Sequence, residues 1–283
     1  MPKKFGFAFW QSQRERLQDL YYNQGLSSNA IGKIYGCYGE TITFNMNRLG
    51  FKLRQIGSKE RPNALYKVNS SFFETIDTEE KAYILGYVIT DGHVTNDGKL
   101  MFAAAEKDRD ILEKIKVAMQ STHHIKEKII HNKPQCILDI SSEAMCKDIR
   151  KYGIDNRKSY TLKMDIIQNT ISPELERHLI RGMIDGDGSL ICTMNKSGFN
   201  KKHTLTISFT GNQNVCGYIA EKLKMTNKWR DEGNGIYSIK TNKRDQVIQI
   251  GSYLYDDATI YLNRKKNKFD EMRQTYLIET DCK

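Results

Sequence analysis

Two short stretches of the 283-residue chain repeat one pattern: Ile84-Leu85-Gly86-Tyr87-Val88-Ile89-Thr90-Asp91-Gly92 and Ile180-Arg181-Gly182-Met183-Ile184-Asp185-Gly186-Asp187-Gly188. Each is a mostly apolar run with glycine at its third position, and each ends in Asp-Gly. Because glycine after a helical run signals a C-terminus, we predict that Asp91 and Asp187 end two helices. A carboxylate at the negative end of a helix dipole costs about 0.3–1 kcal/mol. Two such residues in matching positions therefore indicate a cation between them.

The two stretches resemble the double motif of the LAGLIDADG homing endonucleases in their single-chain form. The resemblance implies that the two motif helices pack side by side, with Gly86 and Gly182 admitting close backbone contact. It also implies that the last acid of each motif, Asp91 or Asp187, binds divalent metal at a scissile phosphate. The expected ion is Mg²⁺, for which Mn²⁺ can substitute.

The metal site that this resemblance implies includes backbone near Thr90 and Gly186. Two positions depart from the family pattern. Ile89 replaces the family's first Asp, which Asp185 keeps, and Arg181 replaces a small apolar residue. Neither departure falls on a metal-binding position, so the expected chemistry stands.

Each motif begins the same order of predicted elements, αββαββα, with hairpins and local helices. The strands alternate apolar and polar residues, as in 137–140 and 205–208, which indicates a half-exposed antiparallel sheet. We therefore predict the α+β class, with two pseudo-twofold αββαββα repeats at about 78–172 and 173–283. Their antiparallel sheets are expected to form a saddle over DNA, preceded by a small all-α domain.

A basic tripeptide closes each copy: Asn156-Arg157-Lys158 in the first and Asn263-Arg264-Lys265 in the second. The resemblance implies that Lys158 and Lys265 stand beside the metal site and orient or polarise the attacking water, so both are candidate catalytic residues. The neighbouring basic residues are expected to hold phosphates. A solvated charge run is the alternative for any single lysine here.

Residues 1–54 resemble a helix-turn-helix module, with a helical stripe around Leu17, a second helix at 30–35 and a third at 40–49. In that motif the third helix enters the major groove. An ordinary three-helix bundle is the alternative. Residues 55–77 read as a basic linker that either stays solvated or follows phosphates. Over the whole chain, the residues predicted to contact DNA are Thr41, Thr43, Asn45, Asn47, Arg48, Lys52, Arg54, Arg157, Lys196, Lys201, Lys202, Arg264 and Lys266.

Composition agrees with a polyanionic partner, since the formal net charge is +10 and basic residues are spread along the chain. The six cysteines have no metal-site spacing, so we expect reduced thiols in an intracellular, cytoplasmic protein without a membrane span. No phosphate-loop, zinc-helix or serine-elbow motif is present.

The resemblance implies a monomeric, phage- or intron-encoded enzyme that cuts both strands of a long double-stranded DNA target and leaves short 3′ overhangs. Two alternatives keep the same fold: a catalytically inactive, sequence-specific DNA-binding regulator and an RNA-splicing maturase. Survival of both motif acids argues against the first, and nothing in the sequence argues against RNA.

Overall fold

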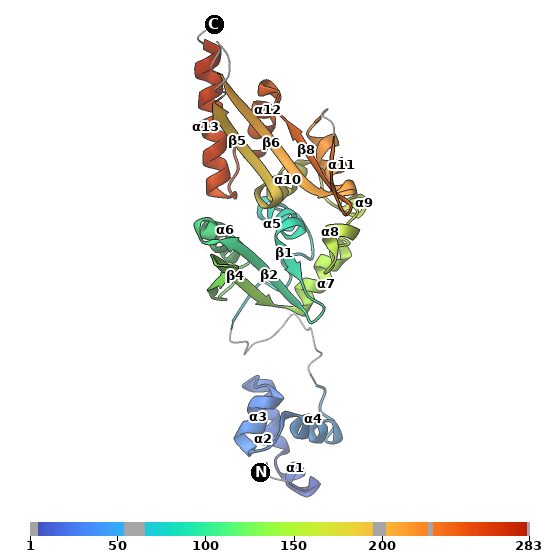
Figure 1. The fold of residues 1–283 in the computed structure, drawn as a ribbon. Coiled ribbons are helices and arrows are strands. Elements are labelled where there is room, and N and C mark those ends of the chain that lie inside the picture. Colours follow the sequence, from blue (N-terminus) through green and yellow to red (C-terminus); the bar gives the residue numbers. More distant parts are fainter. Residues whose placement is uncertain (1–4, 54–65, 195–201, 226–228, 282–283) are drawn as a thin grey trace. The chain divides into compact units, whose positions relative to one another are not determined.

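Helix α5 (Glu79–Thr90) is buried from Ala82 to Ile89, and α10 (Pro173–Asp187) is buried from His178 to Asp185. Local sequence starts both helices: the Thr78 hydroxyl accepts a hydrogen bond from the Lys81 amide at the start of α5, and Pro173 opens α10. A helix that is buried on all sides needs protein around it. The pair accordingly lies side by side between two sheets (Figure 1).

The structure is a computed structural model that describes residues 5–53, 66–194, 202–225 and 229–281. Contacts divide the chain into two units, Met1–Tyr66 and Lys67–Lys283. The helix pair belongs to the second unit.

The first unit contains α1 (Phe7–Ser12), α2 (Arg14–Gln18), a π-helical turn η1 (Asp19–Asn23), α3 (Ser28–Tyr35) and α4 (Gly39–Arg48). Its core gathers around Trp10, Leu17, Ile31, Ile42 and Met46, each with no exposed surface. Ser27 caps α3, and Gly36 ends it in the left-handed region with φ 73°. The short turn between α3 and α4 brings α4 back across α3.

In the second unit the first repeat runs α5, β1 (Gly92–Val94), β2 (Lys99–Ala105), a 3₁₀ turn η2 (Glu106–Asp108), α6 (Arg109–Ala118), β3 (Ile125–Ile130), β4 (Lys133–Ser141) and α7 (Glu143–Lys151). The second runs α10, β5 (Gly188–Met194), β6 (His203–Asn212), α11 (Gln213–Lys222), β7 (Arg230–Gly233), β8 (Ile236–Thr241) and α12 (Arg244–Tyr255). Both follow the predicted αββαββα order. The predicted α+β class is confirmed.

The two sheets share one topology, with strand orders β1-β2-β4-β3 and β5-β6-β8-β7, all neighbours antiparallel. Registers match as well: the glycine that follows each motif acid pairs with a buried phenylalanine, Gly92 with Phe102 and Gly188 with Phe209. Strand β2 alternates buried and more exposed residues. One face of each sheet thus packs on the helices, and the other remains open, as the alternation predicted.

Three helices were not predicted: α8 (Lys158–Thr161), α9 (Asp165–Thr170) and α13 (Asn263–Asp281). Helices α8 and α9 lie at the end of the first repeat, between α7 and α10. Helix α13 packs along β5, with Phe269 and Met272 fully buried. Near its end, Glu279 accepts hydrogen bonds from the His203 amide and from Arg244. The interactions of Glu279 are long-range, so no local pattern signals them.

The predicted linker at 55–77 is wrong in its second half, because residues 67–77 pack on the second unit. Phe72 and Phe73 are buried in that unit's core. The backbone amide of Lys67 donates to the Thr122 hydroxyl at 2.8 Å, and the Thr122 amide donates to the Lys67 carbonyl at 2.9 Å. The two adjacent phenylalanines indicate a buried segment, but the basic residues around them favoured the prediction of a linker. Residues 54–65 lie outside the described part of the chain.

Every cysteine in the described ranges is unpaired, and Cys136, Cys146 and Cys216 are buried. Among the helices that the structure describes, none combines the length and the apolar composition that a bilayer span requires.

Candidate active site

Helices α5 and α10 are in contact through their glycines. A Cβ atom on Gly86 would lie 2.0 Å from the Leu179 carbonyl oxygen, and one on Gly182 would lie 2.0 Å from the Tyr83 carbonyl oxygen. Real Cβ atoms do not approach so closely, so only glycine fits at either position. The structure therefore places both glycines where the sequence predicted close backbone contact.

The same contact continues to the C-terminal ends of the two helices. A Cβ on Gly186 would lie 1.9 Å from the Thr90 hydroxyl oxygen, which brings the two ends together. Asp91 is the residue after α5, and Asp187 is the last residue of α10. The two acids thus come from different repeats and converge at one place.

The electrostatics of Asp91 agree with this convergence. Burial, together with the negative charge of Asp187, raises the pKa of the Asp91 carboxyl to about 6. A hydrogen bond from Tyr87 and the charges of Lys158 and Lys265 act in the opposite direction. A carboxylate whose proton affinity is raised by burial and by a second carboxylate is stabilised by a cation as well as by a proton.

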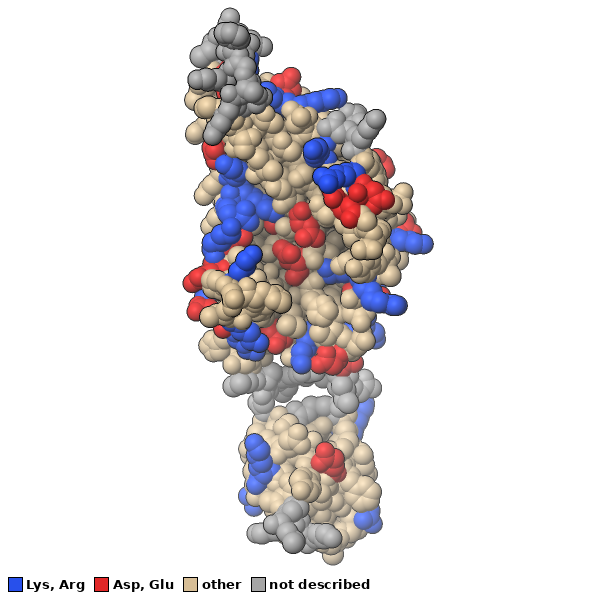
Figure 2. Space-filling model, viewed as in Figure 1, with Lys and Arg blue, Asp and Glu red and all other residues tan. Residues whose placement is uncertain are grey.

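Asp187 is the more accessible acid, since its side chain is exposed. Surrounding protein nevertheless removes enough water to raise the pKa of its carboxyl, while Lys158 and Lys265 lower it. An acid that is both accessible and partly dehydrated is suited to hold a ligand that arrives from solution. Figure 2 shows acidic side chains near the middle of the second unit's face, with Lys and Arg side chains to both sides.

The predicted lysines are buried and bind the helix ends. Lys158 Nζ donates to the carbonyl oxygens of Ile89 at 2.8 Å and Thr90 at 2.6 Å, at the end of α5. Lys265 Nζ lies within 3.0 Å of four carbonyl oxygens at the end of α10, those of Ile184, Asp185, Gly186 and Gly188. Each lysine comes from its own repeat. An ammonium group there offsets the negative end of the helix dipole.

The pKa values of both lysines follow from that burial. Loss of hydration lowers the pKa of Lys265 to about 8, against the opposing effect of Asp185, Asp91 and Asp187. The pKa of Lys158 is also lowered by burial, and Asp187 and Asp91 raise it. The positive charges of both lysines therefore lower the pKa values of Asp91 and Asp187, and the negative charges of the two acids raise the pKa values of the lysines.

The residues present fit a hard divalent cation held by two carboxylates. Within the described ranges, no group of three or more His, Cys, Asp or Glu side chains is arranged to hold a metal. Mg²⁺ is commonly bound through one or two carboxylates, with water and substrate phosphate supplying the other oxygens. The predicted backbone ligands fit less well, because the carbonyl oxygens of Thr90 and Gly186 already accept hydrogen bonds from ammonium groups.

The first acid of the second motif, Asp185, has a different environment. It is buried and accepts hydrogen bonds from the Tyr255 hydroxyl at 2.6 Å, the Tyr83 hydroxyl at 2.8 Å and the Leu262 amide at 2.8 Å. Burial raises the pKa of Asp185, and these hydrogen bonds oppose the rise. With its oxygens engaged in this way, Asp185 ties α10 to α5 and to the segment before α13.

Arg181, the position at which the second motif departs from the family pattern, is fully buried and forms a hydrogen-bond network that the sequence did not predict. Its guanidinium donates to Glu79 at 2.6 Å and to the carbonyl oxygens of Leu254 and Ile260 at 2.9 Å each. Glu79 in turn accepts from the Thr259 amide at 2.7 Å. An arginine inside an apolar helical run does indicate a buried ion pair, because a buried charge requires a partner.

The predicted DNA contacts of the second unit differ in whether they are exposed or already held in ion pairs. Arg157 and Lys202 are exposed. Arg264 is paired with Asp108 through two hydrogen bonds of 2.7 and 2.9 Å, and Lys266 is paired with Asp270 at 2.7 Å. The predicted contacts Lys196 and Lys201 lie outside the described residues.

In the first unit, Thr41 and Thr43 are partly exposed on α4, and Asn47, Arg48 and Lys52 are exposed. The prediction that Asn45 points outward is wrong. Its side chain is 6% exposed, and its amide donates to the Thr41 carbonyl at 2.8 Å within the helix. The predicted contact Arg54 lies outside the described residues.

Comparison with family models gives no match, and no curated protein matches the chain. Solved structures do match. The meganuclease I-AabMI bound to uncleaved DNA is 14% identical over 71% of this chain and 91% of its own, with a TM-score of 0.50. The homing endonuclease I-GzeII in complex with its DNA target is 13% identical over 71% and 91%, with a TM-score of 0.53. I-SmaMI bound to uncleaved DNA with calcium ions is 13% identical over 73% and 92%, with a TM-score of 0.50.

These similar structures and the arrangement of helices and strands identify the fold class of the second unit. The second unit has the fold of the LAGLIDADG homing endonucleases, with two copies of the motif in one chain. The resemblance read from the two motifs is therefore confirmed at the level of the fold.

Proposed function

We propose that the chain is a site-specific endonuclease that uses a divalent metal, Mg²⁺ or Mn²⁺, to cut both strands of double-stranded DNA and leave short 3′ overhangs. One arrangement carries the proposal: Asp91 and Asp187, one from each repeat, stand at the adjoining ends of α5 and α10. Two acids related by a repeat suit a substrate with two antiparallel strands, because each strand then meets its own acid.

Hydrolysis of a phosphodiester concentrates negative charge on the phosphoryl oxygens and on the leaving oxygen. A bound divalent cation supplies positive charge there and makes a coordinated water more acidic. The two carboxylates would hold that cation. Lys158 and Lys265 fix the backbone that carries the acids, through the carbonyl oxygens of both helix ends.

Duplex DNA as the partner is supported by the net charge of +10, by the open sheet faces and by the exposed Arg157 and Lys202. The neighbours I-AabMI and I-GzeII are bound to DNA. Both acids come from one chain, so a monomer suffices. In the first unit, α4 is the proposed reading helix of a helix-turn-helix module, through Thr41, Thr43, Asn47 and Arg48.

The test is cleavage of a randomised duplex library with Mg²⁺, followed by sequencing of the cut ends. Wild-type protein should release a defined family of sites, and Asp91→Asn or Asp187→Asn should abolish double-strand cutting while the fold persists. Asp97→Asn, which changes a surface acid 62% exposed, is the matched control and should cut normally. Full double-strand cutting by either motif variant would refute the assignment of that acid. Binding of defined sites without any cutting would favour the DNA-binding regulator.

A further inference from the structure

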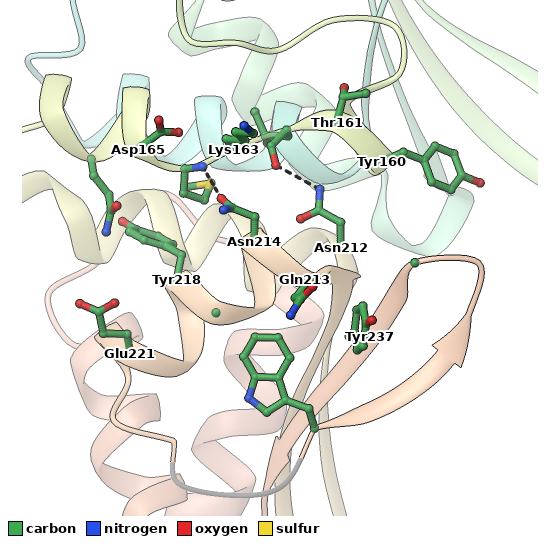
Figure 3. Close-up of a pocket in the computed structure, with 16 residues that line it drawn as sticks. Tyr160, Thr161, Lys163, Asp165, Asn212, Gln213, Asn214, Tyr218, Glu221 and Tyr237 are labelled. Atoms are coloured by element: carbon green, nitrogen blue, oxygen red, sulfur yellow. Dashed lines mark hydrogen bonds between the residues drawn. The ribbon is translucent and has the colours of Figure 1, made fainter.

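A pocket of 710 Å³ lies where the two repeats meet, on the side of α8 and α9 (Figure 3). One wall is the segment from Tyr160 to Gln168 in the first repeat. The other wall is α11, the start of β8 and Trp229 in the second repeat. Its volume falls within the range typical of small-molecule sites, about 300–1,000 Å³.

The equivalent junction on the other side of the repeat pair contains ion pairs and polar contacts. There Arg264 is bound to Asp108, and Lys114 Nζ donates to the Tyr261 carbonyl and to Asn263 Oδ1, each at 2.6 Å. On the pocket side the linking contacts are neutral. The Asn212 side chain donates to the Leu162 carbonyl at 3.2 Å, and the Met164 amide donates to Asn214 Oδ1 at 2.6 Å. The two junctions thus hold the repeats together in different ways, and the uncharged one keeps an opening.

Aromatic rings dominate that opening. Trp229 is 37% exposed and lies on the bare backbone of α11, where a Cβ on Gly217 would be 3.3 Å from the indole ring. Tyr237 meets Trp229 edge-on, with ring centroids 6.1 Å apart. Tyr160, 68% exposed, projects from the opposite wall. Such exposed rings from two elements are unusual on a soluble surface and offer π faces to a planar ligand.

Uncommitted polar groups surround the rings. In the part of the chain that the structure describes, the amide groups of Gln168 and Gln213 and the ammonium of Lys163 have no protein partner, and all three side chains are exposed. Amides of this kind bond the donor and acceptor edge of a base. Asp165 and Glu221 also line the pocket, so its rim is not uniformly basic.

We propose that this pocket binds an unpaired nucleotide, with the base stacked on Trp229 or Tyr160 and its edge bonded by Gln168 or Gln213. Aromatic platforms are how proteins hold single-stranded nucleic acid, and stacking tolerates any base. Lys163 supplies one cation for one phosphate. The carboxylates of Asp165 and Glu221 repel a duplex, whose phosphates are dense, more strongly than a single nucleotide. The site is separate from the acid pair and does not depend on cleavage.

The experiment measures binding of two short unstructured probes, oligo(dT) and oligo(rU) of six nucleotides, and of a hairpin duplex to the full-length protein. Trp229 reports directly, because the chain has only one other tryptophan, the fully buried Trp10. A stacked base should quench the Trp229 fluorescence, and Trp229→Phe should lose that signal. Trp229→Ala or Tyr160→Ala, whichever ring carries the base, should weaken probe binding roughly tenfold, the usual loss for one stacked base.

The matched control is Tyr253→Ala, which removes another surface tyrosine, 41% exposed, on α12. It should bind both probes as the wild type does. Tighter binding of rU would assign the site to RNA, and tighter binding of dT to single-stranded DNA. The proposal would be overturned if neither probe bound the protein. It would also be overturned if both Trp229→Ala and Tyr160→Ala bound the probes as tightly as the wild type does, or if the hairpin competed as well as the single strands. Cleavage of duplex DNA by the pocket variants is measured separately. Loss of probe binding with normal cleavage, or the reverse, then shows which of the two proposals fails.

Discussion

Lys265 Nζ lies 2.7 Å from the carbonyl oxygen of Gly188, the residue that follows Asp187. The same ammonium reaches three other carbonyl oxygens at the end of α10. Only three N–H donors serve these four acceptors. The position of the acid is therefore tied to this one buried charge, as the position of Asp91 is tied to Lys158.

Lys265→Met is expected to lower the free energy of unfolding by about 2–4 kcal/mol, because several buried carbonyl groups lose their donor. Lys158→Met should cost less, since only the carbonyls of Ile89 and Thr90 are affected. Both variants should also cut more slowly. Urea denaturation and single-turnover cleavage measure the two effects.

Lys266→Met is the matched control for the urea measurement, because Lys266 neighbours Lys265 but pairs with Asp270 of its own helix in a partly exposed ion pair of small energy. Unchanged stability in Lys265→Met together with a large loss of rate would contradict this expectation. It would instead support the direct role on the attacking water that the family resemblance implies.

Gly182→Ala is expected to destabilise the second unit by at least about 3 kcal/mol, because the new methyl group would lie 2.0 Å from the Tyr83 carbonyl oxygen. The backbone of α5 would have to move away, which separates the two acids. Thermal unfolding and cleavage should therefore fall together. Val117→Ala, at a position 76% exposed, should change stability by less than about 0.5 kcal/mol. A stable, fully active Gly182→Ala protein would show that the helices do not pack this closely.

The sequence predicted those features that local periodicity determines. Both repeats follow the predicted αββαββα order, because alternation and flanking turns mark the strands. Helix α13 was missed since its charged sequence has little amphipathic signal, and tertiary contacts through Phe269 and Glu279 hold it. Asn45 was placed outward because amides favour surfaces, but it bonds its own helix.

At the candidate site, the motif identified both acids and both glycines, while the contacts of the lysines depended on chain segments distant in sequence. Lys158 and Ile89 are 69 residues apart, and Lys265 and Ile184 are 81 apart. No spacing rule predicts that an ammonium group reaches helix carbonyls over such separations. The network of Arg181 and Glu79, 102 residues apart, escaped prediction for the same reason.

Arg181→Met is expected to destabilise the protein by about 2–4 kcal/mol, because the carbonyl groups of Leu254 and Ile260 would lose their donor and Glu79, with a side chain only 17% exposed, would lose its cation. The double variant Arg181→Met with Glu79→Gln should recover part of that loss, since no uncompensated charge remains. Chemical denaturation of both single variants and the double variant gives the coupling free energy. Additive losses would show that the Arg181–Glu79 pair contributes no interaction of its own.

The raised pKa of Asp91, about 6, predicts how metal-free stability depends on pH. Because the folded value exceeds the unfolded value, the folded state gains stability from the bound proton at low pH and loses it as pH rises through about 6. Without metal, Asp91→Asn should therefore be more stable than wild type above this pH, by on the order of 1–3 kcal/mol. The difference should vanish near pH 4. Unfolding curves in EDTA test this, and Mg²⁺ should then stabilise only the wild type at pH 7. Equal stability across the range would mean that neither burial nor the charge of Asp187 disfavours the ionised Asp91 carboxylate.

The first unit provides the last prediction. Deletion of residues 1–54 should weaken DNA binding and increase off-target cutting while Mg²⁺-dependent cleavage persists. Asp91, Asp187, Lys158 and Lys265 all lie in the second unit, whose core is separate from that of the first. What the deletion removes is α4, with its exposed Asn47 and Arg48, and the exposed Lys52.

Fewer neutralised phosphates should also flatten the salt dependence of binding, by nearly one unit of log–log slope for each phosphate that the truncated protein no longer neutralises. The footprint on DNA should shorten at one end, because the module is attached to only one end of the repeat pair in sequence. Arg48→Ala in the full-length protein should reproduce part of the change in slope, and Glu40→Gln, on the same helix, should not reduce it. If the truncated protein keeps both the footprint and the salt slope, the first unit does not read DNA, and its exposed α4 residues serve another partner.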